Sequence, residues 1–347
     1  MNKFNSILLK LLREANGLTQ DGVCKDKRFN QALWSKWERG LATPTEQMMD
    51  RIADVFKYPR EFLLQPMVDI PTGLVYHRKR TSLRADHRSK IEARARLMAF
   101  DAVKLCQACG VVTKIINREG KSAKEAAKEM RRVWEVKNGP ILNLVELLEK
   151  NGIVIISFDF QTDLIDGFFL PIRGEHECVC IALNTNEAFT PDRQRFTLAH
   201  ELGHAVLHRT EFEVDSKVAE REANAFASEF LLPEGDVSKE LNVKLTFENL
   251  RRLKVKWLVS MAAIARRAND LGIVNDKDYR TTCYFLASSG YRKREPDFEM
   301  KHETASLLRR IVADMFERGE NPDEILMLSE PRLMRRYGLS VIGGKHE

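Results

Sequence analysis

The sequence predicts a mostly α-helical protein with one small mixed sheet, an α+β fold. Apolar residues recur at helical spacing through most of the 347 residues. Three short apolar runs between Ile153 and Leu183 are instead typical of strands. The stretch that follows them, residues 195–208, returns to helical spacing and carries the most informative polar residues of the chain.

The composition predicts a cytoplasmic protein that does not contact a membrane. Hydrophobic residues make up 44% and charged residues 31% of the chain. No apolar run approaches the ~20 residues that span a bilayer, and residues 1–20 lack a signal-peptide pattern. Six scattered cysteines include one C-x-x-C, Cys106 and Cys109, on a predicted helix. Because there is no second pair, we expect these two cysteines to be packing residues and not part of a zinc ribbon or a redox site.

The net charge of +6 is concentrated in one segment, residues 76–96, with eight basic and two acidic residues. A basic stripe of this kind favours binding to the phosphate backbone of a nucleic acid or to an acidic surface of a partner protein. The alternative is a solvated helix face between domains. The basic residues are Arg78, Lys79, Arg80, Arg84, Arg88, Lys90, Arg94 and Arg96.

The first 66 residues predict a compact all-helical domain. Apolar spacing gives a first helix that ends at Gly17, because glycine tolerates a left-handed helix exit. Thr19 can cap a second helix, and a third is expected at residues 30–39. Thr45 opens a fourth helix, which a short final turn at residues 59–64 follows.

Within this domain, GLTQ at 17–20 and NQALWSKWERG at 30–40 resemble the helix-turn-helix of the Xre (Cro-like) regulators. In that family the second helix braces the DNA backbone and the third enters the major groove. The resemblance implies binding to operator-like double-stranded DNA, with a homodimer as one candidate assembly. By position, Trp34 and Val23 belong to the core. The implied DNA-facing residues are Asn30, Gln31, Ser35 and Lys36, and Gln20 and Arg39 support backbone contacts.

The turn between these two helices departs from the family pattern. Relatives place an apolar residue and a glycine there, whereas this chain has Lys27 and Arg28. A non-glycine residue in a left-handed turn costs on the order of 1 kcal/mol, so we expect a reshaped turn. The alternative to DNA binding is a module for dimerisation or partner docking.

Residues 67–138 predict a basic helical connector. One helix is expected from Ser82 onward, and a second at residues 122–136. Ser122 and Glu125 form a capping-box pattern at the start of the second helix. Its apolar stripe needs a partner surface, so we expect both helices to pack onto the following domain.

Residues 139–274 mix helices with strands. Pro140 is expected to start a helix that ends near Gly152. A later helix is expected to be capped by Thr190 and to begin at Pro191, and it includes residues 195–208. The strands are expected at residues 153–158, 166–172 and 178–183, with a turn at 173–177.

That later helix contains His200, Glu201 and His204 in H-E-x-x-H spacing. The two histidines lie one turn apart on one face, roughly 6 Å along the axis, so both can reach one metal ion. Zinc with three protein ligands keeps a position open for water, and Glu201 can accept a proton from that water. The motif predicts metal-assisted hydrolysis, most often of a peptide bond. The alternative is a buried helix with two incidental histidines.

Two histidines leave zinc (Zn2+) one protein ligand short. His208 lies one further turn along the helix, about 12 Å from His200, which is too far to share a metal. Glu220 and Glu222 lie on a helix expected at residues 214–232, and only one of them can face the site. Geometry alone leaves this choice open.

The stretches RFTLAHELGHAVLH at 195–208 and EREANAFASEFLLP at 220–233 closely resemble the ImmA/IrrE family of zincin-like metallo-endopeptidases. The family places a ligand glutamate four residues before an asparagine and a proline nine residues after it. With Asn224 and Pro233 in register, the resemblance selects Glu220 as third ligand and makes Asn224 a partner that orients a ligand histidine. It extends over about residues 138–274.

Members of this family cleave helix-turn-helix repressors. The leading hypothesis is therefore a zinc endopeptidase that regulates transcription by cleaving such a repressor, either a partner or its own domain. One alternative is a DNA-binding repressor or antitoxin-like regulator whose peptidase domain senses metal or a partner without turnover. A hydrolase of small molecules is weaker, because a sheet edge suits an extended chain.

Residues 275–347 predict a charged helical region of unassigned role. The run at 279–286 is expected as a short strand or buried turn. Amphipathic helices are expected at 301–317 and 322–328, and the tail from Gly338 is expected to fray. The expected division of the chain is 1–66, 67–138, 139–274 and 275–347.

Overall fold

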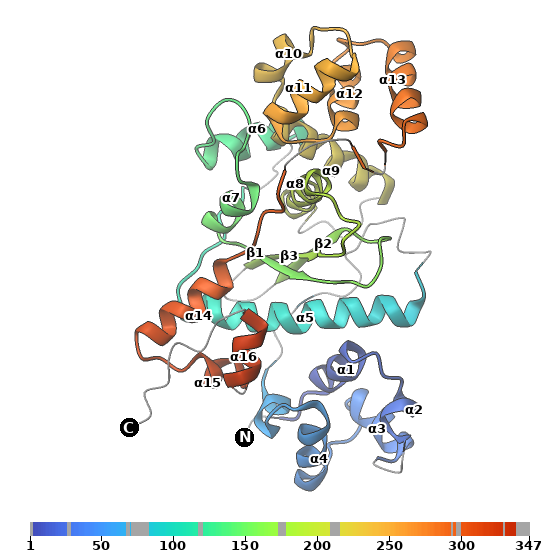
Figure 1. Ribbon diagram of the computed structural model, residues 1–347. Coiled ribbons are helices and arrows are strands. Elements are labelled where there is room, and N and C mark those ends of the chain that lie inside the picture. The colour runs from blue at the N-terminus through green and yellow to red at the C-terminus, as the bar shows by residue number, and fades with distance from the viewer. Residues whose placement is uncertain are drawn as a thin grey trace.

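The computed structural model confirms a mostly helical fold around one three-stranded sheet (Figure 1). The long helix α5 runs under the sheet, and α8 and α9 lie over it. Within the described residues, no helix combines the length and apolar character needed to span a bilayer. The structure describes residues 3–25, 29–66, 70, 83–116, 121–172, 178–208, 216–292, 294–295, 300–328 and 330–337.

The sheet has the order β1-β3-β2, so β2 lies at an edge. Strand β1 (Ile153–Phe158) pairs in parallel with β3 (Cys178–Asn184), and β2 (Gly167–Ile172) pairs antiparallel with β3. Every residue of β3 is buried, as a central strand covered on both faces requires. The mixed sheet and its three strands are therefore confirmed to within one residue at each end.

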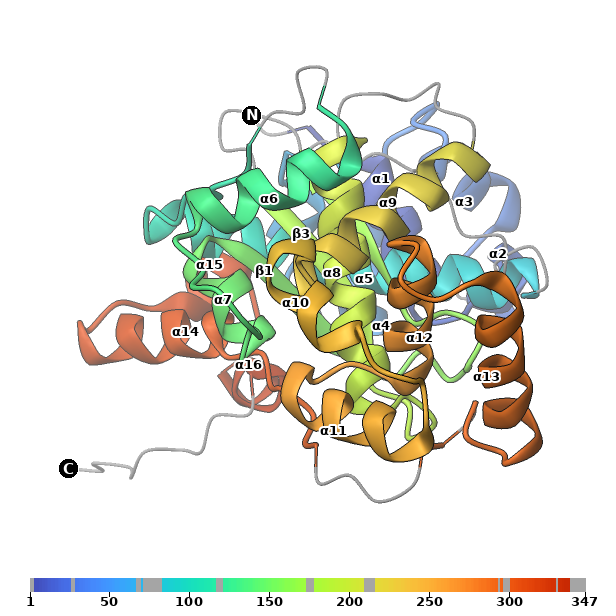
Figure 2. The same cartoon turned by 90° about the horizontal axis from the view of Figure 1, so that it is seen from above.

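Two hydrophobic cores lie on the two faces of this sheet. Val154 and Ile156 of β1 face the core that includes α5 and the N-terminal domain. Their neighbours Ile153 and Ile155 face the core that includes α8 and α9, because successive strand residues point to opposite faces. Figure 2 shows α6, α9 and α12 gathered over α8 on this second side.

The described residues of the N-terminal domain form four short α-helices and a closing 3-10 turn. The expected caps are confirmed: Thr19 accepts from Gly22 N and Thr45 accepts from Met48 N. Trp34 and Val23 lie in the core, as predicted. Lys27 and Arg28 lie outside the described residues. The elements are α1 (Ser6–Ala15), α2 (Gln20–Val23), α3 (Gln31–Glu38), α4 (Glu46–Phe56) and η2 (Arg60–Leu64).

Helices α5 (Ala85–Ala108) and α6 (Ala123–Val133) pack against different parts of the protein. Helix α5 contacts α1 and the sheet, whereas α6 contacts α8 and α9. Both bonds of the expected capping box at the start of α6 are present. Each helix thus joins a different one of the two cores.

Much of the described basic segment on α5 is engaged in contacts with its neighbours. Lys90 Nζ donates to Gln161 Oε1 at 3.1 Å, and Arg96 Nη2 donates to the Ile70 carbonyl at 2.6 Å. Arg78, Lys79 and Arg80 lie outside the described residues. The Cys106 thiol is buried, and among the described residues the C-x-x-C is not part of any metal-ligand group.

The metal-motif helix α8 (Pro191–Leu207) begins at Pro191, as expected, but the expected cap is wrong, because the Thr190 side chain makes no capping hydrogen bond. The expectation that Pro140 starts the preceding helix is wrong, because α7 spans Leu144–Lys150. The Asn143 side chain accepts from Glu146 N and caps α7, so a stronger cap sets the helix start. Helix α9 (Ser216–Leu231) follows α8 and lies against it.

The expectation of a strand or turn at residues 279–286 is wrong. The run lies inside helix α13, which Asn275 caps, and Tyr284 of the run is 77% exposed. Helix α14 begins at Leu307 and not at residue 301, because the Glu149 carboxylate accepts from the Leu307 main-chain N at 2.8 Å. The tail from residue 338 lies outside the described residues. The remaining helices are α10 (Glu234–Leu241), α11 (Phe247–Trp257), α12 (Met261–Asp270), α13 (Asp276–Ser288), α14 (Leu307–Glu317), α15 (Pro322–Leu326) and α16 (Glu330–Tyr337).

Candidate metal centre and nucleic-acid interface

Helix α8 holds the H-E-x-x-H residues in a buried position between the sheet and α9. His200, Glu201 and His204 are all less than 7% exposed. Gly203 allows α9 to approach closely, since a Cβ at this position would lie 3.2 Å from both Cα and O of Ala223. The short distance between the helices brings the side chains of α9 within reach of the two histidines.

Three candidate metal ligands from α8 and α9 converge on one point. His200 Nε2 and His204 Nε2 lie 3.1 Å apart. Glu220 places Oε1 3.3 Å from His204 Nε2 and Oε2 3.7 Å from His200 Nε2. Ligands about 2.1 Å from a tetrahedral zinc ion lie roughly 3.4 Å from one another, and the observed spacings bracket that value. The donor set therefore fits a divalent metal ion.

Each histidine is also held through its other ring nitrogen. His200 Nδ1 lies 3.1 Å from Asn224 Oδ1, and the Asn224 amide donates to the Glu220 carbonyl at 2.7 Å. His204 Nδ1 lies 3.1 Å from Nδ1 of His208. Such contacts fix the ring orientation, so that Nε2 points to the site.

The contact of Glu222 with His208 was not predicted from the sequence. Glu222 Oε2 lies 2.9 Å from His208 Nε2, so the contacts run from Glu222 through His208 to His204. From the sequence, Glu222 was only an alternative to Glu220 as the third metal ligand. The signal that could have indicated it is the spacing of His208, one turn after His204 on the same helix face.

The candidate base Glu201 points toward the edge strand. Phe169 of β2 donates its main-chain N–H to Glu201 Oε2 at 2.9 Å. Because β2 pairs with β3 along its other side, this bond lies on the side of β2 that faces away from the sheet. The carboxylate is thus anchored next to the strand edge on which an extended chain could pair.

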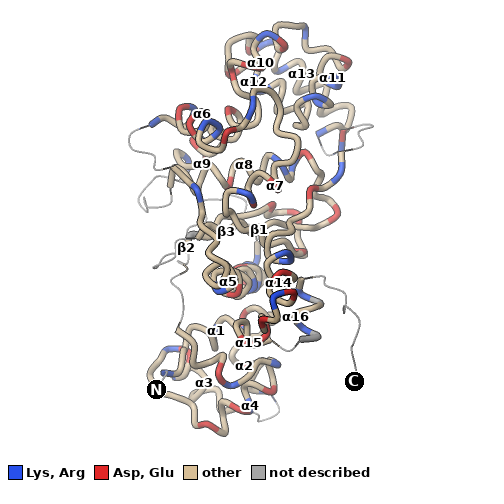
Figure 3. Tube along the Cα trace, turned by 90° about the vertical axis from the view of Figure 1, so that its left-hand side faces the viewer, with Lys and Arg blue, Asp and Glu red and all other residues tan. Residues whose placement is uncertain are grey.

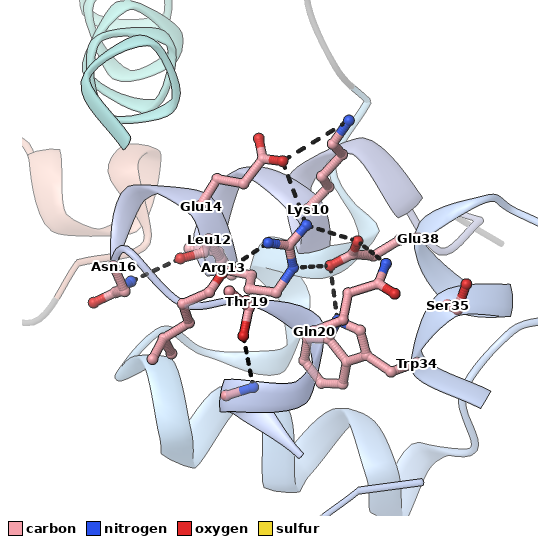
Figure 4. Close-up of polar contacts among 12 residues, drawn as sticks. Lys10, Leu12, Arg13, Glu14, Asn16, Thr19, Gln20, Trp34, Ser35 and Glu38 are labelled. Atoms are coloured by element: carbon pink, nitrogen blue, oxygen red, sulfur yellow. Dashed lines mark hydrogen bonds and ion pairs between the residues drawn. The ribbon is translucent and has the colours of Figure 1, made fainter. Parts of the chain in front are cut away.

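The six residues predicted for DNA binding do not share one environment. Glu38 at the end of α3 accepts hydrogen bonds from Arg13 Nε at 2.5 Å, Gln20 Nε2 at 2.8 Å and Trp34 Nε1 at 2.7 Å (Figure 4). Burial alone would raise the pKa of Glu38, but the hydrogen bonds from Arg13, Gln20 and Trp34 outweigh it and lower this pKa. Gln20 is therefore held within the domain.

The outer face of α3 carries the other predicted residues. Gln31, Lys36 and Arg39 are exposed, and Ser35 is half-buried. The Asn30 side chain accepts from Leu33 N at 3.0 Å and so caps the helix. Asn30 is exposed as well, so five of the six lie at the accessible side of α3, whereas half-buried Gln20 is bonded to Glu38. Their contact with DNA stays a prediction.

Comparisons with known proteins support a two-domain assignment. Residues 148–269 match the model of the IrrE N-terminal-like domain. Residues 6–62 match the model of a helix-turn-helix domain. The chain is 32% identical over 118 residues to "Uncharacterized immunity region protein 2" of Bacillus phage phi105, a match that covers 31% of this chain and 70% of that protein.

Proposed function

The chain belongs to the ImmA/IrrE family of metallopeptidase-type proteins and carries a helix-turn-helix domain, and we propose that it is a zinc-dependent endopeptidase that regulates transcription. Its proposed substrate is a helix-turn-helix repressor, either a partner protein or its own N-terminal domain. The observation that carries the proposal is the convergence of His200, His204 and Glu220 beside Glu201.

His200, His204 and Glu220 would hold the metal ion. Two imidazoles and one carboxylate suit zinc, although the same donors accept other divalent ions. A bound ion would supply Lewis-acid polarisation of the scissile carbonyl and lower the pKa of water. The contacts from Asn224 and His208 support this assignment, because each orients one ligand ring.

Glu201 would act as general base and then as general acid. Its carboxylate would accept a proton from the attacking water and pass that proton to the leaving amine nitrogen. The bond from Phe169 N holds this carboxylate beside the edge of β2, where the scissile bond of an extended substrate would lie. A fixed position matters, since proton transfer requires heavy atoms within about 3 Å.

The edge strand β2 supports a polypeptide substrate in preference to a small molecule. An extended segment can add to such an edge through main-chain hydrogen bonds, which require no particular side-chain sequence. The helix-turn-helix domain would bind DNA through Gln31, Ser35, Lys36 and Arg39 on the outer face of α3. The phage relative comes from an immunity region by name, which agrees with a role in regulation. A homodimer and the four expected segments of the chain stay part of the proposal.

Co-expression with helix-turn-helix repressors encoded by neighbouring genes tests the proposal. We expect wild type to produce one specific cut, identified by mass spectrometry. Glu201→Gln should give no cut at equal zinc content, because it keeps the ligands and removes the base. Glu248→Gln, an exposed change on α11, is the matched control and should cut like wild type.

The same experiment separates the proposal from a regulator that does not turn over. If Glu201→Gln regulates the target genes as well as wild type, and no repressor fragment forms with either protein, the peptidase proposal fails. The chain would then be a DNA-binding repressor or antitoxin-like regulator whose second domain senses metal or a partner.

A further inference from the structure

A second candidate site lies at the junction of the N-terminal domain with the rest of the protein. A cavity of about 760 Å³ opens between the ends of α1 and α4, the middle of α5, the end of β1 and helix α16. This volume lies within the usual range of small-molecule sites. The cavity borders the α5 side of the sheet, whereas the metal centre lies on the α8 side. It is therefore a separate site.

The lining of this cavity is basic. It includes the side chains of Lys57, Arg94, Arg332 and Arg336, and no acidic residue contributes to it. Figure 3 shows that α5 and α16, which supply the three arginines, both carry basic positions and lie close together. Four cations around one cavity favour an anionic occupant.

Two of these arginines are held in place by both halves of the protein. Arg332 of α16 donates to the Lys57 carbonyl at 2.6 Å, and its guanidinium lies 4.1 Å from the centre of the Tyr58 ring. Arg336 forms an ion pair with Asp101 of α5, and its Nη2 lies 3.3 Å from the Tyr58 hydroxyl. Helix α16 thus links the N-terminal domain to α5 at the cavity wall.

Arg94 of α5 lies over an aromatic ring. Its guanidinium lies 4.6 Å from the centre of the Phe158 ring. Partial desolvation by neighbouring groups and, second, the positive charge of Arg336 lower the pKa of Arg94, and Asp159 offsets this only in part. Within the described parts of the chain, no ion pair involves Lys57, Arg94 or Arg332. None of these three cations is thus neutralised by a direct ion pair there, while Arg332 already donates to the Phe56 and Lys57 carbonyls.

We propose that this cavity binds a phosphorylated small molecule of about mononucleotide size. Lys57, Arg94 and Arg332 would bind the phosphate, since guanidinium groups match phosphate oxygens in charge and geometry. Half-buried Val55 and Met98 give the lining an apolar part that the uncharged portion of such a ligand would contact. A ligand in this cavity would contact both the N-terminal domain and the metal-binding half. Its binding would therefore change the position of one relative to the other.

The position of the cavity argues against duplex DNA as its occupant. Its N-terminal lining comes from the ends of α1 and α4, and no residue of α2 or α3 contributes. The predicted DNA face therefore lies on other helices of the same domain. A small anion could bind while that face remains accessible.

Calorimetric titration of the full-length protein with AMP tests the proposal. We expect AMP to bind wild type and to raise its Tm, and adenosine, which lacks the phosphate, to produce neither effect. Arg94→Gln and Lys57→Gln should each weaken AMP binding about 10-fold, through the loss of a charge-assisted contact. Both side chains are exposed, so the variants should fold. Lys90→Gln, the same charge change one turn earlier on α5, should bind AMP within about twofold of wild type.

Three results would overturn the proposal. One is no AMP binding to folded wild type at millimolar concentration. Another is equal AMP affinity of wild type, Arg94→Gln and Lys57→Gln, which would place the ligand elsewhere. The third is displacement of AMP by a short DNA duplex, which would make the cavity part of a nucleic-acid surface. Inorganic phosphate serves as a second probe: weaker binding than AMP supports a mononucleotide, and equal binding contradicts that size.

Discussion

The metal centre and the outer face of α3 differ in how strongly the fold constrains their residues. At the centre, His200, His204 and Glu220 are brought within 4.8 Å of one another by two tightly packed helices. On α3, the predicted residues need only be exposed, and Gln20 is drawn into the bonds around Glu38 instead. A site that joins several atoms at one point must be encoded by residue spacing. A DNA-binding surface requires only side chains that the fold leaves accessible.

The largest expected effect comes from the ligand that α9 supplies. Glu220→Ala should weaken zinc binding by more than about 100-fold, because it removes one of three ligands. Glu222→Ala removes only the partner of His208 and should cost about 10-fold. Competition titration against a chromophoric chelator measures both affinities. A larger loss of zinc affinity for Glu222→Ala than for Glu220→Ala would mean that Glu222, and not Glu220, is the metal ligand.

A second test concerns the bonds that hold Gln20 inside the N-terminal domain. Glu38→Gln should destabilise this domain by about 2 kcal/mol at pH 7, because the largely buried Arg13 then loses the closer of its two charged partners and keeps only Glu14. The Trp34 and Trp37 fluorescence reports unfolding of the domain in urea.

The acid dependence of that stability checks the pKa of Glu38. Its folded pKa is lowered, so its contribution is present above the unfolded value of about 4.3 and is lost as the pH falls through the folded pKa. Wild type should therefore lose more stability than Glu38→Gln between pH 5 and 3. Equal losses of stability in the two proteins would mean that the hydrogen bonds to Glu38 do not stabilise its ionised form.

A third, smaller effect tests the close contact of α8 with α9. In Gly203→Ala the new methyl group meets the backbone of Ala223, so α9 must shift by a few tenths of an ångström. Such overpacking costs about 1–3 kcal/mol, and the better helix propensity of alanine offsets roughly 1 kcal/mol. We expect a net loss of about 1 kcal/mol in thermal unfolding, together with weaker zinc binding. Unchanged zinc affinity would show that the site tolerates movement of α9.

The smallest expected effect is at the DNA interface. Lys36→Ala should lower the slope of log affinity against log salt by about 1, as expected for one lost phosphate contact. Fluorescence anisotropy with promoter DNA between 50 and 200 mM salt measures this slope. Gln31→Ala should leave the slope unchanged and alter sequence preference. Binding that does not depend on salt would contradict the proposed use of α3.

The sequence predicted the features that depend on local spacing. His200 and His204 lie one helical turn apart, and both the helix and its start at Pro191 follow from nearby residues. The start of α7 was misplaced because the Asn143 cap outweighs Pro140. The run at 279–286 was misread as a strand or turn because apolar content over eight residues does not reveal which helix face is buried.

Features that join distant segments could not be predicted. The basic cavity depends on Arg336 reaching Tyr58, which lies 278 residues away in the chain. The bond from Phe169 N to Glu201 depends on how β2 lies against α8. The choice between Glu220 and Glu222 also rested on resemblance to a family, because the sequence between α8 and α9 carries no signal of the relative rotation of the two helices.

The position of a bound metal is the most direct test of the proposed ligands His200, His204 and Glu220. Anomalous X-ray diffraction at the zinc edge, on crystals of the zinc-loaded full-length protein, locates the ion without any assumption about its ligands. We expect one peak about 2.0–2.2 Å from His200 Nε2, His204 Nε2 and a carboxylate oxygen of Glu220. A peak beside His208 and Glu222, or no peak beside His200 and His204, would contradict this set of ligands.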